Sequence, residues 1–184
     1  MRNGKIVIAE VGVGPLGMSY GALVWTNSNI HMLMFEPLPE YYNQNLVAAN
    51  GRTNVELYNV AIGDENGRLK LYNEGTSSSL EGVASPFAQH HKEPPESKPY
   101  VEVDVRRISE FDKGDIDILR LDTEGNEWFC LKHLISRPKQ IVVETYNDLG
   151  TYINPYLFEI CKWAESNVYK RVAVADSDFI YERQ

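Results

Sequence analysis

Residues 6–17 read IVIAEVGVGPLG, and this stretch decides the fold. The run from Ile6 to Ile8 is β-branched and continuous, which is typical of a strand buried on both faces. Glycines at the end of such a strand let the backbone come close to a ligand, and the N-terminus of a following helix offers free N–H groups. The stretch therefore predicts a strand, a ligand-binding turn and a helix, which we expect through Leu23 to Trp25.

Strand-like and helix-like segments alternate along the rest of the chain. Strands are predicted at 30–35, 54–58, 68–72, 101–105, 116–121 and 141–143, and helices at 39–49, 128–134 and 154–164 with Asn154 as the N-cap. Residues 168–181 predict an antiparallel hairpin. Alternating strands and helices favour a parallel sheet with helices on both faces. We expect one α/β domain over residues 1–184, with a mostly parallel, doubly wound sheet and a C-terminal antiparallel hairpin.

Residues 73–99 differ from the segments around them. They are rich in Ser, Gly and Pro and poor in aliphatic side chains. A segment of this length without periodicity is typical of a functional lid or of a disordered linker, and we favour a long loop or lid over the site.

Composition narrows the class of partner. The 184 residues carry 26 acidic and 18 basic side chains, for a formal charge of -8. This balance argues against nucleic acid, which needs a clustered basic surface. No stretch approaches the roughly 18 apolar residues of a membrane span. The two cysteines, Cys130 and Cys161, form no C-x-x-C pair, and we expect both as buried thiols. Reduced cysteines and the lack of a signal segment together predict a cytoplasmic protein.

Polar clusters follow five of the predicted strands. They are Glu10 to Gly14, Glu36, Asn59 to Asp64, Asp122 to Glu127, and Glu144 to Asn147. Each cluster alone is explained equally well by a tight turn or by an acidic helix start. In an open parallel sheet, however, all five fall on the edge where ligands bind. Together they predict a nucleoside-type cofactor with carboxylates beside it.

Two cofactors are consistent with the first turn. Gly12-x-Gly14-x-x-Gly17, with Glu36 about 20 residues on, matches the dinucleotide fingerprint and would indicate an NAD(P)-binding oxidoreductase. Against this, Glu10 is placed to receive the ammonium of an amino-acid-bearing cofactor, and no Tyr-x-x-x-Lys pair is present. S-adenosylmethionine fits better, and NAD(P) stays the alternative.

Several motifs resemble those of the FkbM-type methyltransferases. They are Phe35-Glu36-Pro37-x-Pro39, Leu46 with Asn50, Asn54-Val55, Asn59-x-Ala61-Ile62-Gly63-Asp64, Ser78-Ser79-Leu80, and Ile118-x-x-Leu121-Asp122-x-Glu124-Gly125-x-Glu127. The resemblance runs from about Ile6 to Glu144. It implies a Rossmann-like, S-adenosylmethionine-dependent enzyme that methylates an oxygen of a sugar or another small metabolite.

The resemblance also implies roles for individual residues. Glu10, Gly12 and Gly14 correspond to the first cofactor motif, Glu36 to the ribose acid, and Asn59, Ala61 and Asp64 to the adenine side. Asp122, Glu124 and Glu127 correspond to the segment facing the reaction centre. The first motif departs from the family's Asp-x-Gly-Ala-x-x-Gly, because position 10 is Glu, position 13 is Val and Gly17 falls one residue late. This departure and the short N-terminus keep an inactive, methyltransferase-like binding scaffold as an alternative, and make a homodimer plausible.

An oxygen acceptor must lose a proton, so a nearby base is expected. Asp122 is the first candidate and Glu124 the second, whereas His90 and His91 lie in the predicted loop and are more typical of inert exposed side chains. Ser79, Glu127 and Tyr146 are the candidate acceptor contacts. We expect no bound metal. A divalent cation on Asp122, Glu124 and Glu127 is the weaker alternative.

Overall fold

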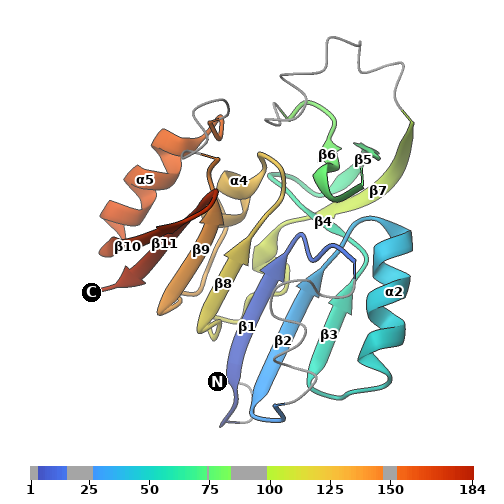
Figure 1. Cartoon of the computed structure of the whole chain (residues 1–184), viewed down its shortest axis with the longest axis horizontal. Helices are drawn as coiled ribbons and strands as arrows, with labels where there is room; N and C mark the ends of the chain where they lie inside the picture. The colour runs from blue at the N-terminus through green and yellow to red at the C-terminus, as the bar shows by residue number, and fades with distance from the viewer. Residues whose placement is uncertain (1–3, 16–26, 74, 84–98, 147–152) are drawn as a thin grey trace.

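The computed structural model describes residues 4–15, 27–73, 75–83, 99–146 and 153–184. Its large sheet has seven strands (Figure 1). They are β1 (Ile6–Val11), β2 (Ile30–Phe35), β3 (Val55–Tyr58), β8 (Ile118–Leu121), β9 (Gln140–Glu144), β10 (Tyr169–Ala175) and β11 (Asp178–Arg183). The β1 strand is the continuous apolar run of the sequence, and its residues from Val7 to Val11 are all buried, as expected for a strand covered on both faces.

The strands of this sheet follow the order β10-β11-β9-β8-β1-β2-β3. The pairs from β3 to β9 are parallel, whereas β11 pairs antiparallel with both β9 and β10. This confirms the predicted doubly wound sheet with a C-terminal antiparallel hairpin. Strand order reverses at β1, because β2 lies on one side of it and β8 on the other. An open α/β sheet binds ligands at such a reversal.

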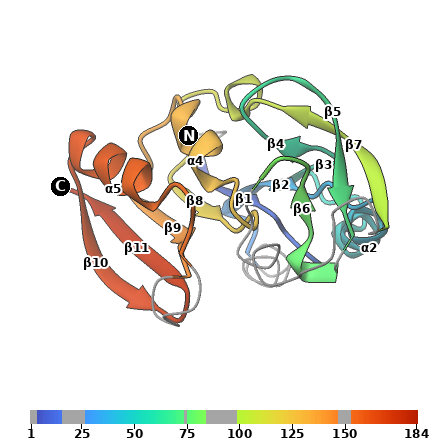
Figure 2. The ribbon, with the colours of Figure 1, turned by 90° about the horizontal axis from the view of Figure 1, so that it is seen from above.

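A second, smaller sheet is formed by β4 (Ala61–Ile62), β5 (Gly67–Tyr72), β6 (Ser79–Leu80) and β7 (Tyr100–Arg106), in the order β4-β7-β5-β6. It stands at the carboxyl ends of β1 to β3 (Figures 1 and 2). The alternate residues Leu69 and Leu71 of β5 differ in burial, since Leu71 is 2% exposed and Leu69 is 39% exposed. Only the end of β5 at Leu71 is paired with β6 and covered.

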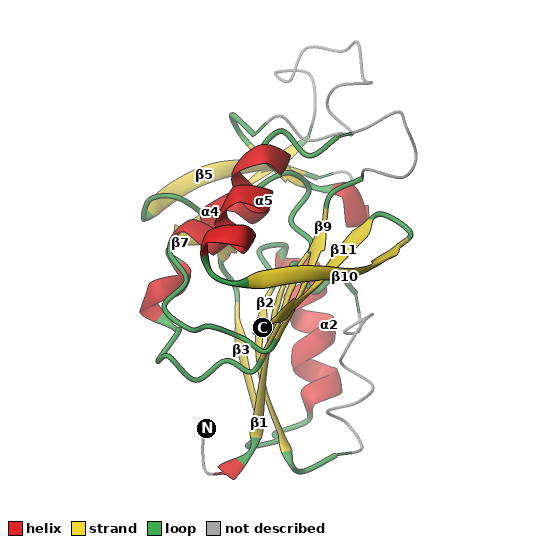
Figure 3. Ribbon diagram, turned by 90° about the vertical axis from the view of Figure 1, so that its left-hand side faces the viewer, coloured by secondary structure: helices red, strands yellow, loops and turns green. Residues whose placement is uncertain are grey.

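Three α-helices lie within the described residues and flank the large sheet. They are α2 (Pro39–Ala49), α4 (Glu127–Lys132) and α5 (Leu157–Ser166), and two 3₁₀ turns, η2 (Gly75–Ser77) and η4 (Ile108–Glu110), complete the described elements. Figure 3 shows α4 and α5 on one face of the sheet and α2 on the other. The helix expected through Leu23 to Trp25 lies outside the described residues, as does most of the predicted lid. None of the described helices is long and apolar enough to cross a membrane.

Two details of the helices differ from the prediction. The α5 helix begins at Leu157 rather than at Pro155, because Asn154 forms a separate turn in which its Oδ1 accepts the N–H of Tyr156 at 2.9 Å. The spacing of Tyr42, Leu46 and Ala49 at i, i+4 and i+7 predicts the apolar face of α2, but its buried residues are Asn45 and Ala49, and Leu46 is half exposed. Apolar spacing alone could not place Asn45 inside, because its burial depends on hydrogen bonds to backbone elsewhere.

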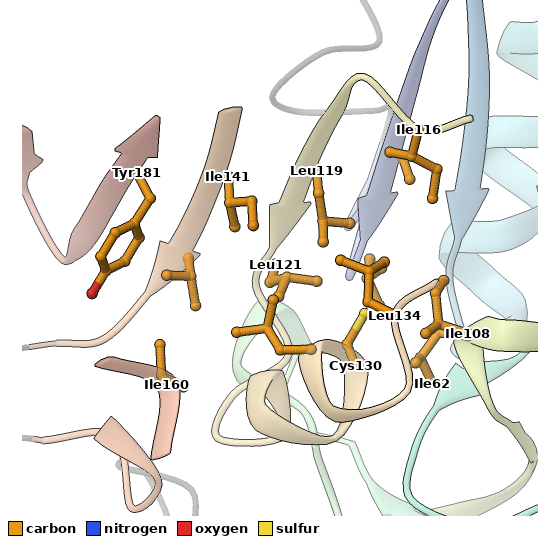
Figure 4. Packing of buried hydrophobic residues seen from close by; sticks show 14 of the residues in the cluster. Ile62, Ile108, Ile116, Leu119, Leu121, Cys130, Leu134, Ile141, Ile160 and Tyr181 are labelled. Atoms are coloured by element: carbon orange, nitrogen blue, oxygen red, sulfur yellow. The ribbon is translucent and has the colours of Figure 1, made fainter. Parts of the chain in front are cut away.

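The main core lies between the large sheet and the pair α4 and α5 (Figure 4). Leu119 and Leu121 of β8 and Ile141 of β9 face Cys130 of α4 and Ile160 of α5, and all are nearly or completely buried. Burial raises the pKa of the Cys130 thiol well above its ordinary value. Cys130 is therefore a structural thiol, as predicted, while Cys161 is partly exposed.

Leu119→Ala tests the core. Leu119 is completely buried in the central strand β8, so the substitution removes apolar contacts and leaves a cavity. We expect a loss of roughly 2–5 kcal/mol in the free energy of unfolding, measured by urea denaturation. The matched control is Leu46→Ala on α2, where the side chain is 50% exposed and the change should stay within about 0.5 kcal/mol. Equal losses in the two variants would contradict this assignment of the core.

Candidate functional site

A cavity of about 300 Å³ opens at the carboxyl ends of β1, β2 and β8. Both sheets contribute to its wall. The lining residues are Val11–Gly14, Phe35–Leu38, Tyr41, Val60–Ile62, Leu71, Gly75, Ser78, Leu80, Arg120, Asp122–Glu124, Asn126 and Glu144. The cavity therefore lies where the strand order reverses, as the sequence predicts for a ligand site.

The turn after β1 forms the floor of the cavity and requires glycine. Gly12 has φ +82°, and a Cβ at this position would lie 1.7 Å from the backbone oxygen of Asp122. Its N–H donates to the carbonyl of Phe35 at 3.0 Å, while the N–H of Asp122 donates to the carbonyl of Val11 at 3.0 Å. The turn thus fits between the ends of β2 and β8. Gly14 also has a positive φ of 66°, and Gly17 lies outside the described residues.

Two buried polar side chains hold this turn. Glu36 accepts the N–H of Gly14 and the N–H of Leu38, each at 2.8 Å. Asn45 of α2 donates through Nδ2 to the carbonyl of Gly14 at 2.7 Å. Burial is the main cause of the raised pKa of Glu36. Glu36 also lines the cavity, and a carboxylate that accepts two bonds keeps lone pairs for a ligand hydroxyl.

One half of the cavity is apolar. Leu38, Ala61, Leu71 and Leu80 come from the loop after β2 and from the small sheet, and they pack in one cluster. A flat apolar group such as an adenine ring suits such a wall. Ala61, which the resemblance assigns to the adenine side, is part of this apolar wall.

Asn59 and Asp64 belong to the same motif but do not line the cavity. Asn59 donates through Nδ2 to the carbonyls of Glu36 and Pro37 at 2.9 and 3.0 Å. Asp64 lies 2.6 Å from Nζ of Lys132 and 2.7 Å from Nε2 of His133, and hydrogen bonds from these two groups lower its pKa. Both residues support the fold around the cavity.

The other half of the cavity is acidic. One carboxylate oxygen each from Asp122, Glu124 and Glu144 can be chosen so that all three lie within 4.8 Å of one another. Tyr146 donates its hydroxyl to Oε2 of Glu124. Burial is the largest cause of a pKa near 7 for Glu124, which is a suitable value for proton transfer at neutral pH. The predicted candidates Asp122, Glu124 and Tyr146 therefore lie together, and Glu144 joins them.

Arg120 lies at the centre of this acidic half. Its Nη2 is 2.9 Å from Oδ2 of Asp122, and its Nη1 is 3.8 Å from Oε1 of Glu10. Glu10 is completely buried and does not line the cavity, so Arg120 separates it from the open space. Sequence reasoning missed Arg120 because it reads as an isolated base within a strand. The signal was present, since Arg120 and Asp122 are two residues apart and alternate residues share one face of a strand.

Glu127 and Ser79, predicted as acceptor contacts, lie behind the cavity wall. Glu127 accepts the N–H of Thr123 at 2.7 Å and that of Gly125 at 3.2 Å through Oε1, and Asn154 donates to its Oε2 at 2.5 Å. It therefore shapes the turn that carries Glu124. Ser79 is buried in β6, and its neighbour Ser78 lines the cavity instead. His90 and His91 fall outside the described residues.

Comparison with known proteins agrees with this geometry. A family model described as the methyltransferase FkbM domain matches residues 17–171. No curated protein matches the chain by sequence.

Similar solved structures include a protein of Corynebacterium glutamicum, with a TM-score of 0.51 and 10% identity over 98% of this chain and 73% of that one. The fibrillarin pre-rRNA processing protein of Methanococcus jannaschii has a TM-score of 0.50 and 12% identity over 98% of this chain and 67% of that one. These two similarities show the fold. The precorrin-6y C5,15-methyltransferase of Geobacter metallireducens has a TM-score of 0.48 and 14% identity, with 96% and 78% of the two chains covered.

Gly12→Ala tests the floor of the cavity. The added methyl group would collide with the backbone after β8 at a φ that disfavours alanine, so the two loops must separate. We expect a lower unfolding temperature and at least tenfold weaker binding of S-adenosylmethionine, measured by differential scanning fluorimetry and calorimetry; a shift of about 1.4 kcal/mol suffices for that factor. Gly67→Ala is the control, because no atom lies within 4 Å of the position that its Cβ would take. Wild-type binding by Gly12→Ala would contradict the close approach.

Glu124→Gln tests how much the buried carboxyl of Glu124 lowers the free energy of unfolding. The folded state raises the pKa of Glu124 from 4.5 to about 7, so it favours the neutral form. As the pH rises from 4.5 to about 7, the ionisation of Glu124 therefore lowers the free energy of unfolding by on the order of 3 kcal/mol. Glutamine stays neutral and still accepts the Tyr146 hydroxyl. We expect the variant to be more stable than wild type at about pH 8 but not at about pH 5, by urea denaturation. The exposed Glu65→Gln should show no such difference, and a variant of equal or lower stability at both pH values would refute the argument.

Proposed function

The chain belongs to the FkbM methyltransferase domain family and is an S-adenosylmethionine-dependent methyltransferase; from that premise we propose that it methylates a hydroxyl oxygen of a small acceptor, with sugars as the acceptor class. The observation that carries the proposal is one cavity whose glycine floor and carboxylate cluster meet at the reversal of strand order. The acidic half supports a polyhydroxylated acceptor, because carboxylate oxygens accept hydrogen bonds from hydroxyl groups.

The residues present fit the cofactor. The Gly12 turn leaves room that a Cβ would fill, Glu36 offers acceptor capacity to ribose hydroxyls, and the apolar wall around Ala61 and Leu80 suits adenine. When bound there, S-adenosylmethionine supplies an electrophilic methyl group. The remaining work of the protein is to align the acceptor and to take its proton.

Asp122 is the proposed proton acceptor. It lines the cavity, and Nη2 of Arg120 lies 2.9 Å from its Oδ2. Glu124 is close enough to share this task and to bind a second hydroxyl of the acceptor. In this arrangement Tyr146 fixes the carboxyl of Glu124 by its hydrogen bond.

The proposed partner is a small molecule, without nucleic acid and without a membrane surface. The net charge of -8 supports the first exclusion. A cytoplasmic location and a homodimer stay predictions of the sequence. An NAD(P)-binding oxidoreductase and an inactive scaffold are the alternatives, and ligand binding separates them.

Cofactor binding is tested by thermal unfolding with S-adenosylmethionine, S-adenosylhomocysteine, NADH and NADPH in turn. A ligand at one hundred times its dissociation constant stabilises by about 2.7 kcal/mol, which is a rise of roughly 5–10 °C for a domain of this size. We expect the rise with the two adenosyl compounds alone. A rise with the nicotinamide compounds alone would contradict the proposal.

Asp122→Asn tests the proton acceptor. We expect transfer of a labelled methyl group to a panel of free sugars and glycosides to fall roughly 10²–10⁴-fold, while S-adenosylmethionine affinity changes by less than about threefold. Asp176→Asn is the control, since it lies in the turn before β11 with φ 51°, a conformation that asparagine tolerates. Retained turnover in Asp122→Asn would remove this residue from the mechanism. Cofactor binding without turnover on any acceptor would favour the scaffold.

A further inference from the structure

We propose that Asp122 and Glu144 share a single proton, which resides on Glu144, and that Glu144 is thereby a positioning residue for Asp122. The sharing follows from the arrangement of side chains alone. Its catalytic meaning rests on the proposed function.

The pair is built by strand register. β8 and β9 are parallel neighbours in which Leu121 pairs with Val143. Asp122 follows β8 directly and Glu144 is the last residue of β9, so this register brings two carboxylates side by side, and both line the same cavity. Oxygen atoms of the two lie within 4.8 Å of each other. Two carboxyl groups this close in a partly buried site disfavour double ionisation and tend to hold one proton between them.

The surroundings place that proton on Glu144. Arg120 forms an ion pair with Asp122 at 2.9 Å, and no ion pair reaches Glu144 among the described residues. Ser177 donates to Oε1 of Glu144 at 3.2 Å, but Oε2 is buried and has no hydrogen-bond partner among the described residues. At Oε2 an ionised carboxylate loses its solvation without a hydrogen bond in return. A proton on Oε2 would turn it into a donor, and the neighbouring carboxylate of Asp122 would accept from it.

No other cation reaches Glu144 from the described elements packed around it. Glu124 and Tyr146 face it from the loops after β8 and β9, Asp178 pairs with it from β11, and Glu10 lies behind Arg120. Burial, and then the charge of and hydrogen bond to Asp122, raise the pKa of Glu144 to about 10. Burial also raises the pKa of Tyr146, so its phenol stays a donor.

The shared proton gives Asp122 one defined task. Bound S-adenosylmethionine would supply the methyl group to the acceptor oxygen and keep the electron pair of the carbon–sulfur bond on sulfur, and Asp122 would receive the acceptor proton. The pair then holds two protons and returns one to solvent. Glu144 orients the receiving oxygen by its hydrogen bond throughout.

Infrared spectroscopy tests the pair without any acceptor, because a protonated carboxyl has its own carbonyl stretch. At about pH 8.5, between the pKa values of Glu124 and Glu144, the wild-type protein should show this band, and Glu144→Gln should lose one carboxyl equivalent of it. The matched control Glu65→Gln, at an exposed position, should leave the band unchanged. In Asp122→Asn the like charge is absent, so the band should disappear at a pH lower by about one unit or more than in wild type.

Each outcome decides the proposal. An unchanged band in Glu144→Gln overturns it, and so does a wild-type titration midpoint in Asp122→Asn. Full loss of the band when Mg²⁺ or Mn²⁺ is added at millimolar concentration also overturns it, because the three carboxylates then hold a cation in place of the proton. Loss of the band in Glu144→Gln together with failure to bind S-adenosylmethionine would support the shared proton while refuting the proposed function.

Discussion

The close approach of the Gly12 turn to the end of β8 is the constraint on which the rest of the site depends. A side chain at Gly12 would overlap the carbonyl oxygen of Asp122. The backbone after β1 can therefore pack this closely against the backbone after β8 only when residue 12 is glycine. The same contact fixes the backbone of Asp122, whose N–H bonds to Val11. The cofactor floor and the proposed proton acceptor are therefore parts of one backbone arrangement, and a change in either moves both.

The buried carboxylates in the acidic half of the cavity lower the stability of the folded protein, and this loss of stability indicates a functional role. Burial raises the pKa of both Glu124 and Glu144, so the folded state disfavours the charged form of each carboxyl group. Arg120 is the one arginine or lysine lining the cavity among the described residues, and it contacts Asp122 and Glu10 rather than these two. A purely structural cluster would gain stability from neutral side chains. Strongly shifted carboxyls in a cleft are instead typical of sites that move protons.

The sequence predicted most of the large sheet because its strands are apolar runs and its hairpin alternates. It could not predict features that depend on partners far along the chain. Asn45 is polar on the buried face of α2, where its Nδ2 donates to the carbonyls of Gly14 and Tyr41. The small sheet supplies Leu71 and Leu80 to the cavity through pairing that no local pattern encodes. Glu144 was noticed as a polar strand end, but its pairing with Asp122 follows from strand register.

The motif residues divide into those that touch the cavity and those that build it. Glu127 accepts the N–H of Gly125 and thereby holds the turn that carries Glu124. Asn59 donates to the carbonyl of Glu36 and thereby holds the backbone just after β2. A resemblance in such residues therefore identifies a scaffold for methyl transfer more than it identifies the reacting groups. Arg120 falls at an unspecified position of its motif, yet it lies against Asp122. Arg120 and Glu144, the two neighbours of Asp122 on which the proposed shared proton depends, are side chains that the motifs leave open.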